Sequence, residues 1–241
     1  MMNILVVNDD GIEAEGIKIL QEVMKKYGNV YVSAPLEQQS AKSHSITILN
    51  SFKAQKISDT VYGVGGTPAD CVKFAIHKFD VEFDLVVSGI NDGPNLGGDV
   101  FYSGTVAGAT EGALYNIPGI ALSVGGRRDF TLAKKELENT LDFVILNKLY
   151  SNNIVLNINF PNPKFSESKG FKVCKQGKKE YRTTFVEADG LFHNKYEIIQ
   201  SENDETTDMY AHENGYIGIT PLLINRTNID YIDTLKEKVN Q

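Results

Sequence analysis

The first 160 residues alternate short apolar runs with segments in which apolar residues recur every three or four positions. Short apolar runs are typical of strands buried in a parallel sheet, and the wider spacing is typical of amphipathic helices. The pattern therefore predicts an α/β fold: a Rossmann-like, mostly parallel sheet with helices on both faces. The predicted strands are residues 4–7, 30–34, 46–49, 61–64, 84–88, 119–124 and 154–158, and the predicted helices start near residues 17, 67, 104 and 132.

Several residues mark where these helices begin and end. Thr67 is placed to cap a helix, with Pro68 at its first position and Asp70 three residues after the cap. Gly28 follows the first apolar-periodic segment, and we expect it to end that helix in the left-handed conformation.

The pattern changes after about residue 165. Strand-like segments with turn signals such as Asp189-Gly190 replace the strand and helix alternation, and a helical pattern returns only at residues 229–239. We expect an α/β catalytic core over residues 1–164 and a β-rich C-terminal extension over residues 165–241. Because exposed strand edges need cover, we expect a partner chain or a helix to cover the edges of this extension.

Composition narrows the possible functions. The chain of 241 residues is 41% hydrophobic and has neither a membrane-length apolar run nor a recognisable signal peptide, so we expect a cytoplasmic protein without a membrane partner. The net charge of −7 disfavours binding to a nucleic acid duplex. Two cysteines, Cys71 and Cys174, are too few for a disulfide framework, and we expect both to be buried, reduced thiols.

In residues 4–16, ILVVNDDGIEAEG, two adjacent carboxylates, Asp9 and Asp10, closely follow a predicted apolar strand. Two carboxylates about 4 Å apart repel by roughly 4 kcal/mol at an effective dielectric constant of about 20. A cation between them would remove that cost. Either aspartate alone could instead cap a helix or close a turn, but the adjacent pair favours a metal.

Two further polar residues are predicted to lie at the same edge of the sheet. Ser40 follows the second strand, and Asn91 follows the strand that ends near Ser88. Ligands bind outside the carboxyl ends of parallel strands, and Mg²⁺ or Mn²⁺ prefers carboxylate, amide and hydroxyl oxygens. We therefore predict one divalent ion, although Ser40 and Asn91 taken singly also fit ordinary loop residues.

A second candidate feature is the start of the helix near residue 104. Ser103, Gly104 and Thr105 stand where free backbone N–H groups attract anions, so this turn is a candidate phosphate site. The alternative, that Ser103 only caps the helix, fits this stretch equally well. Gly104, Gly108 and Gly112 share one helical face, which we expect to pack on the sheet. A phosphate site beside a divalent ion predicts metal-assisted phosphoester hydrolysis, in which Asp9 or Asp10 holds the metal and orients the attacking water.

Six stretches of the chain together match one known family: ILVVNDDGI, SAPLEQQSAKSHSIT, GTPADCV, DLVVSGINDGPNLGGDVFYSGTVAGATEG, NINFP and GYIGITPL. In these stretches the chain resembles the SurE family of metal-dependent nucleotidases. The resemblance implies that Asp9, Asp10, Ser40 and Asn91 bind the metal and that Asn95 joins residues 103–105 at the phosphate. It also implies hydrolysis of nucleoside 5'- and 3'-monophosphates, with short-chain polyphosphate as a further substrate, by a homodimer or homotetramer whose subunits exchange the C-terminal extension.

The chain departs from the family pattern after the second strand. Leu36 and Glu37 stand where the family usually has an Asp-Arg pair, and Gln39 replaces a basic residue. The lost positive charge bears on substrate affinity and not on the metal ligands. His44 could donate a proton to the leaving group, and Tyr102 could stack on a base, but ordinary structural roles fit both residues.

Two other classes of protein share parts of this pattern. A receiver domain would need a phosphoacceptor aspartate at the position of Ser88, and a dinucleotide-binding oxidoreductase would need a G-x-G-x-x-G turn after the first strand. Neither requirement is met. A non-enzymatic nucleotide-binding protein remains the alternative, and turnover would separate it from an enzyme.

Overall fold

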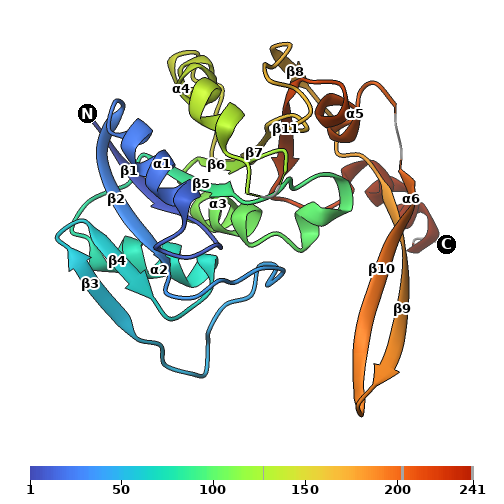
Figure 1. Ribbon diagram of the computed structural model, residues 1–241, viewed down its shortest axis with the longest axis horizontal. Coiled ribbons are helices and arrows are strands. Elements are labelled where there is room, and N and C mark those ends of the chain that lie inside the picture. Colours follow the sequence, from blue (N-terminus) through green and yellow to red (C-terminus); the bar gives the residue numbers. More distant parts are fainter. Residues whose placement is uncertain (127, 202–203, 240–241) are drawn as a thin grey trace.

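The computed structural model, which describes residues 1–126, 128–201 and 204–239, is built on one nine-stranded sheet (Figure 1). The strand order is β3-β4-β2-β1-β5-β6-β7-β11-β8, and the strands from β4 to β7 are all parallel. β3 and β11 each run antiparallel to a neighbour. The strands are β1 (Met2–Val7), β2 (Gly28–Pro35), β3 (Ala54–Ser58), β4 (Val61–Val64), β5 (Leu85–Asn91), β6 (Gly119–Ser123), β7 (Ile154–Asn159), β8 (Phe171–Val173) and β11 (Ile217–Leu223).

Helices cover both faces of the sheet, as predicted. Alternate residues of β1 point to opposite faces, so Ile4 and Val6 pack in the core under α1 and α4, whereas Leu5 and Val7 pack in the core under α2. The α/β fold class is therefore confirmed. The helices are α1 (Glu15–Met24), α2 (Pro68–Lys78), the 3-10 helix η1 (Gly97–Phe101), α3 (Gly104–Leu114), α4 (Thr131–Leu146), α5 (Asp208–Glu213) and α6 (Ile229–Val239).

All four predicted helices are present, and two of them, α2 and α3, start at capping residues. The Thr67 side chain accepts a hydrogen bond from the Asp70 backbone N–H, and the Asp70 carboxylate accepts one from the Thr67 N–H, which completes a capping box on α2. Ser103 caps α3 by accepting from the Val106 N–H at 3.1 Å. This cap fixes the first turn of α3 near the edge of the sheet at which the parallel strands end.

Gly28 does not end α1 in a left-handed conformation, so that prediction is wrong. It is the first residue of β2, and it pairs with Met2 of β1. A Cβ atom at this position would lie 2.0 Å from the Met2 carbonyl oxygen. The glycine is therefore required by the close approach of two backbones and not by a positive φ angle.

The strand predicted over residues 46–49 is also wrong, since these residues form no strand. The Thr47 backbone N–H and hydroxyl both donate to the Asp70 carboxylate, at 2.8 Å each, in place of ladder hydrogen bonds. The side chains of Ile48 and Leu49 are exposed. β3 instead pairs antiparallel with β4, a few residues further along the chain.

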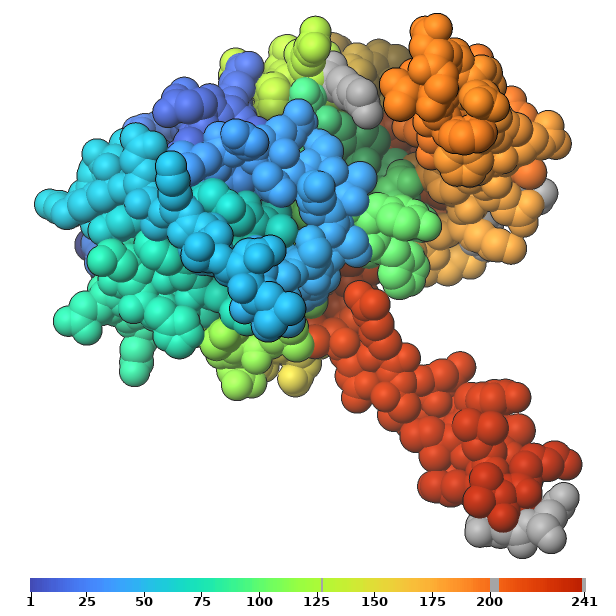
Figure 2. Space-filling view, turned by 90° about the horizontal axis from the view of Figure 1, so that it is seen from below, coloured from blue at the N-terminus to red at the C-terminus, as the bar shows by residue number. Residues whose placement is uncertain are grey.

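The part of the chain after residue 165 divides between the sheet and two projecting elements. β8 and β11 extend the main sheet, whereas β9 (Lys179–Ala188) and β10 (Leu191–Ser201) form a separate antiparallel hairpin that projects from it (Figure 1). The chain then ends in an arm carrying α6, which extends away from the body (Figure 2). The β-rich character predicted for this part of the chain is confirmed, and the domain division at residue 165 stays a prediction.

Two compositional predictions can be compared with the structure. Cys71 and Cys174 are both free and buried, as expected. Among the described helices, none combines the length and apolar character needed to cross a membrane.

Candidate active site

The candidate site lies where three adjacent strands end. β2, β1 and β5 are neighbours in the sheet, and their carboxyl ends lead to Ser40, to Asp9 and Asp10, and to Asn91. β5 runs three residues beyond the predicted end at Ser88, so Asn91 is its last residue and does not lie in the following loop. The sheet order thus brings the predicted ligands to one edge.

A tight turn presents the two aspartates. The Asn8 side chain closes this turn, because its Oδ1 accepts from the Gly11 N–H at 3.2 Å and its Nδ2 donates to the Gly11 carbonyl at 2.9 Å. Gly11 has φ of 106°, a conformation that favours glycine. This local geometry explains why Asn8 and Gly11 flank the aspartate pair.

Asp9 is almost completely buried. Its Oδ1 accepts a 2.6 Å hydrogen bond from the Thr105 hydroxyl at the start of α3. Burial is the main cause that raises the pKa of Asp9 to about 6, with the charge of Asp10 adding to it and the Thr105 hydrogen bond opposing it. A bound cation would stabilise the ionised form of this buried carboxylate.

Asp10 lies beside Asp9 and is held by donors from two other segments. Its Oδ2 accepts from the Asp92 backbone N–H at 2.9 Å, and its Oδ1 accepts from Gln38 Nε2 at 3.3 Å. Burial raises the pKa of Asp10 as well, and the Asp92 charge adds to that effect. The contact with Asp92 fixes Asp10 next to the end of β5.

The donor set fits a hard divalent cation. Among the described residues, no lysine or arginine side chain forms an ion pair with Asp9 or Asp10. The Asn91 side chain donates through Nδ2 to the Gly93 carbonyl at 2.7 Å, which leaves its amide oxygen available. Among the described residues, no group of three or more His, Cys, Asp or Glu side chains is placed to hold a metal ion, so a metal here would depend on two carboxylates with amide and hydroxyl oxygens.

Ser40 is the least constrained of the predicted ligands. It is exposed and lies in an irregular segment, but the backbone N–H of the preceding Gln39 donates to the Asp9 carbonyl at 2.8 Å. That contact ties the Ser40 segment to the aspartate turn. The ligand role of Ser40 stays a prediction, as do those of Asp9, Asp10 and Asn91.

The start of α3 packs directly against Asp9. A Cβ on Gly104 would lie 2.7 Å from Asp9 Cβ and 2.9 Å from its Oδ2, so only glycine fits at this position without displacing Asp9. Further along α3, Gly108 and Gly112 approach Val7 and Val86 of the sheet. The glycine face therefore packs on the sheet as expected, and it meets a candidate ligand only in its first turn.

Asn95 belongs to a buried polar network that the sequence pattern did not reveal. Its Nδ2 donates to the Ser123 hydroxyl at 2.9 Å and to the Thr105 hydroxyl at 3.5 Å. Asn157 and Asn159 of β7 hold its backbone, with donors 2.9 and 3.1 Å from the Asn95 carbonyl oxygen. The motif NINFP contains both β7 asparagines and was the only signal for them in the sequence.

In this network, the side chains of two predicted phosphate-binding residues, Asn95 and Thr105, donate hydrogen bonds to other protein side chains. The Thr105 hydroxyl donates to Asp9, and the side-chain N–H groups of Asn95 point to Ser123 and Thr105. Thr105 therefore positions Asp9 through its side chain, and what it offers an anion is its backbone at the helix start. The phosphate roles of Asn95, Ser103, Gly104 and Thr105 stay predictions.

His44 and Tyr102 are the two residues whose roles the sequence left open. His44 Nε2 lies 2.6 Å from the Oε2 of Glu111 on α3. Tyr102, which directly precedes Ser103, has 62% of its surface exposed. Tyr102 is thus placed beside the candidate phosphate turn without being buried in the core.

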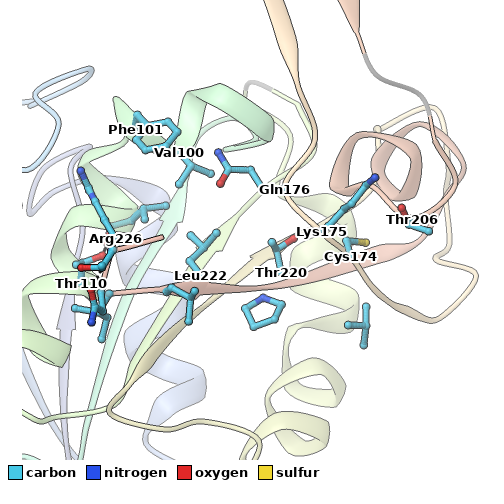
Figure 3. Close-up of a pocket in the computed structure, with 17 residues that line it drawn as sticks. Val100, Phe101, Thr110, Cys174, Lys175, Gln176, Thr206, Thr220, Leu222 and Arg226 are labelled. Carbon is cyan, nitrogen blue, oxygen red and sulfur yellow. Dashed lines mark hydrogen bonds between the residues drawn. The ribbon is translucent and has the colours of Figure 1, made fainter. Parts of the chain in front are cut away.

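A separate cavity of about 700 Å³ lies on another part of the molecule (Figure 3). Residues of η1, α3, β8 and β11 and of the segments after β8 and β11 line it, including Phe101, Cys174 and Leu222. None of the predicted metal or phosphate residues belongs to its lining. The cavity is therefore distinct from the candidate active site.

The family model, the sequences of known proteins and a solved structure all match this chain as one family, and the matching sequences and structure cover nearly all of it. Residues 4–183 match the family model described as survival protein SurE. The chain is 43% identical to the 5'-nucleotidase SurE of Petrotoga mobilis over 98% of each chain, and 41% identical to that of Clostridium botulinum strain Eklund 17B over 98% of this chain and 99% of the relative. It also resembles the crystal structure of the SurE protein from Aquifex aeolicus, with a TM-score of 0.84 and 39% identity over 98% of this chain and 99% of the other.

Proposed function

The chain belongs to the SurE family and is a nucleotidase, and we propose that it hydrolyses nucleoside 5'- and 3'-monophosphates to nucleoside and phosphate with one divalent metal ion per subunit. Mg²⁺ and Mn²⁺ are the proposed ions, and short-chain polyphosphate is a proposed further substrate. A cytoplasmic location is part of the same proposal. The receiver alternative lacks support, since Ser88, the required phosphoacceptor position, is completely buried.

The observation that carries the proposal is the contact between the buried Asp9, which lies next to the half-buried Asp10, and a helix start. Thr105 at the first turn of α3 donates to Asp9, and Gly104 of the same turn packs against it. A cation held by Asp9 and Asp10 would therefore lie next to backbone N–H groups that attract a phosphoryl group. These two requirements of phosphomonoester hydrolysis meet within one small region.

Each residue then has a proposed part. Asp9, Asp10, Asn91 and Ser40 hold the cation through oxygen atoms. The backbone of residues 103–105 binds the phosphate and orients it, while Thr105 keeps the Asp9 carboxylate in place. When bound, the metal supplies neutralisation of the phosphoryl oxygens and acidification of water.

Removal of divalent ions is expected to abolish phosphate release. Purified protein treated with a chelator should release no phosphate from AMP or GMP, and added Mg²⁺ or Mn²⁺ should restore it, because no cationic side chain of the described residues replaces the ion beside Asp9 and Asp10. A panel of 5'- and 3'-monophosphates and short polyphosphates, assayed with each ion, measures this requirement. Undiminished turnover in chelator would remove the metal from the proposal.

We also propose that the C-terminal elements pair subunits in a homodimer or homotetramer. None of the described side chains of α6 is buried, and Ile229, Leu235 and Val239 are all more than half exposed. The β9–β10 hairpin likewise exposes Phe185, Leu191 and Phe192. A second copy of this chain would cover these apolar surfaces.

Leu235→Glu is expected to weaken that association. A charge placed on the apolar face of α6 would have to be buried in the proposed interface, whereas Thr234→Glu adds the same charge to the same helix outside the apolar positions. Light scattering after size-exclusion chromatography should show smaller species for Leu235→Glu only. An unchanged oligomer for both variants would contradict a role for α6.

A further inference from the structure

Ser40 belongs to an irregular segment, residues 36–50, that contacts the aspartate turn of the candidate site. Residues 36–50 contain no helix or strand, and two of them, Ala41 and Ser43, have φ angles of 56° and 55°. Residues other than glycine adopt this left-handed conformation at an energetic cost. The segment therefore needs contacts outside itself to hold its shape.

Backbone contacts supply part of that support. At one end, the Gln39 N–H donates to the Asp9 carbonyl. In the middle, the Ser43 N–H donates to the Tyr102 carbonyl at 3.0 Å and its hydroxyl to the Phe101 carbonyl at 2.6 Å. The segment thus touches both the aspartate turn and the residues that precede the phosphate turn.

One side-chain contact anchors the same segment to α3. His44 Nε2 lies 2.6 Å from Glu111 Oε2, and because a carboxylate can only accept, the imidazole is the donor in this pair. The His44 side chain is 25% exposed and the Glu111 side chain 7%. A buried carboxylate is costly without a partner, and His44 is the partner that the segment provides. Ser40 lies four residues before His44, on the far side of the two left-handed residues.

We propose that the His44–Glu111 pair is a positioning device: it fixes the segment so that Ser40 stays within reach of the cation, and it thereby sets metal affinity. The inference rests on the proposed metal site. His44 acts here through Ser40 and not on substrate. Residues that support metal ligands typically change metal affinity by about 10- to 100-fold when they are altered.

Three variants and one control test the pair. His44→Ala removes the donor, His44→Gln keeps an N–H donor of similar reach, and Glu111→Gln removes the carboxylate charge while keeping its shape. His77→Ala is the matched control, because His77 lies exposed in the last turn of α2. The thermal midpoint of every variant is measured first, and all assays are run below the lowest midpoint.

The first readout is limited trypsin digestion of the metal-free protein. Lys42 is exposed and is the only lysine or arginine in residues 36–50, so the peptide ending at Lys42 reports on opening of the segment. We expect cleavage after Lys42 to be about fivefold faster in His44→Ala than in the wild type. His44→Gln and His77→Ala should be cleaved at rates close to that of the wild type.

The second readout is Mn²⁺ affinity, measured by the signal of free Mn²⁺ in electron paramagnetic resonance. We expect His44→Ala and Glu111→Gln to bind Mn²⁺ about tenfold more weakly, with His44→Gln closer to the wild type and His77→Ala unchanged. A pair that only stabilises the fold would lower the thermal midpoint and leave both readouts unchanged, and that result would overturn the proposal. If the wild type itself bound no Mn²⁺, the proposed metal site would fail instead, and the trypsin comparison would still decide whether the pair holds the segment.

Discussion

Asp10→Asn is expected to reduce nucleotide hydrolysis by at least about 1,000-fold, which corresponds to about 4 kcal/mol of lost transition-state stabilisation. The substitution removes one of two carboxylate charges that would hold the cation. The asparagine oxygen can still accept from the Asp92 backbone N–H, which now donates to Asp10 at 2.9 Å, so the turn should keep its shape. Phosphate release at saturating metal and substrate measures the effect.

A matched control separates charge at the site from charge in general. Asp59→Asn makes the same chemical change at an exposed residue that forms only a surface ion pair with Lys56. It should leave turnover and the circular dichroism spectrum unchanged. Near-normal turnover by a folded Asp10→Asn protein would exclude Asp10 as an essential ligand.

Gly104→Ala is expected to lower turnover by about 100-fold with little loss of fold. The added Cβ would lie 2.7 Å from Asp9 Cβ, a distance that real Cβ atoms essentially never show, so either Asp9 or the first turn of α3 must move. A displacement of about 1 Å in a catalytic arrangement can cost about 100-fold in rate. Because the change adds one methyl group and no charge, its effect measures how closely Asp9 and the helix start must meet.

Gly98→Ala is the control for the loss of a glycine. Gly98 lies in η1, near the start of α3 in the sequence, but a Cβ there would meet no atom within 4 Å. Equal activity of Gly98→Ala and the wild type, together with low activity of Gly104→Ala, would fit the proposed contact. Full activity of Gly104→Ala would show that the distance between Asp9 and α3 does not limit the reaction.

Much of the fold follows from local patterns in the sequence. Apolar runs located the parallel strands, and the caps at Thr67 and Ser103 located two helices, because both signals depend only on neighbouring residues. The aspartate pair after β1 was equally visible. Strand order then brings Asp9 and Asp10 near Asn91, since β1 and β5 are adjacent.

What the sequence did not reveal depends on contacts between distant residues. Thr47 gives its backbone N–H to Asp70 and not to a strand, and Gly28 is required by Met2. The Thr105–Asp9 hydrogen bond joins residues 96 positions apart. No pattern of propensity or spacing encodes such pairs, because they arise only when the sheet has formed.

The glycine face of α3 also limits the positions at which the amino-acid sequence of this protein can change. Cβ atoms on Gly104, Gly108 and Gly112 would each come within 3.0 Å of an atom of the sheet or of Asp9. The helix can therefore neither move closer to the sheet nor accept larger side chains at these positions. The proposed phosphate-binding turn would therefore be a rigid frame shared by every substrate. Adaptation to a new base or sugar would have to arise in the rim around it, for example at Tyr102, whose ring is exposed and can change without disturbing that frame.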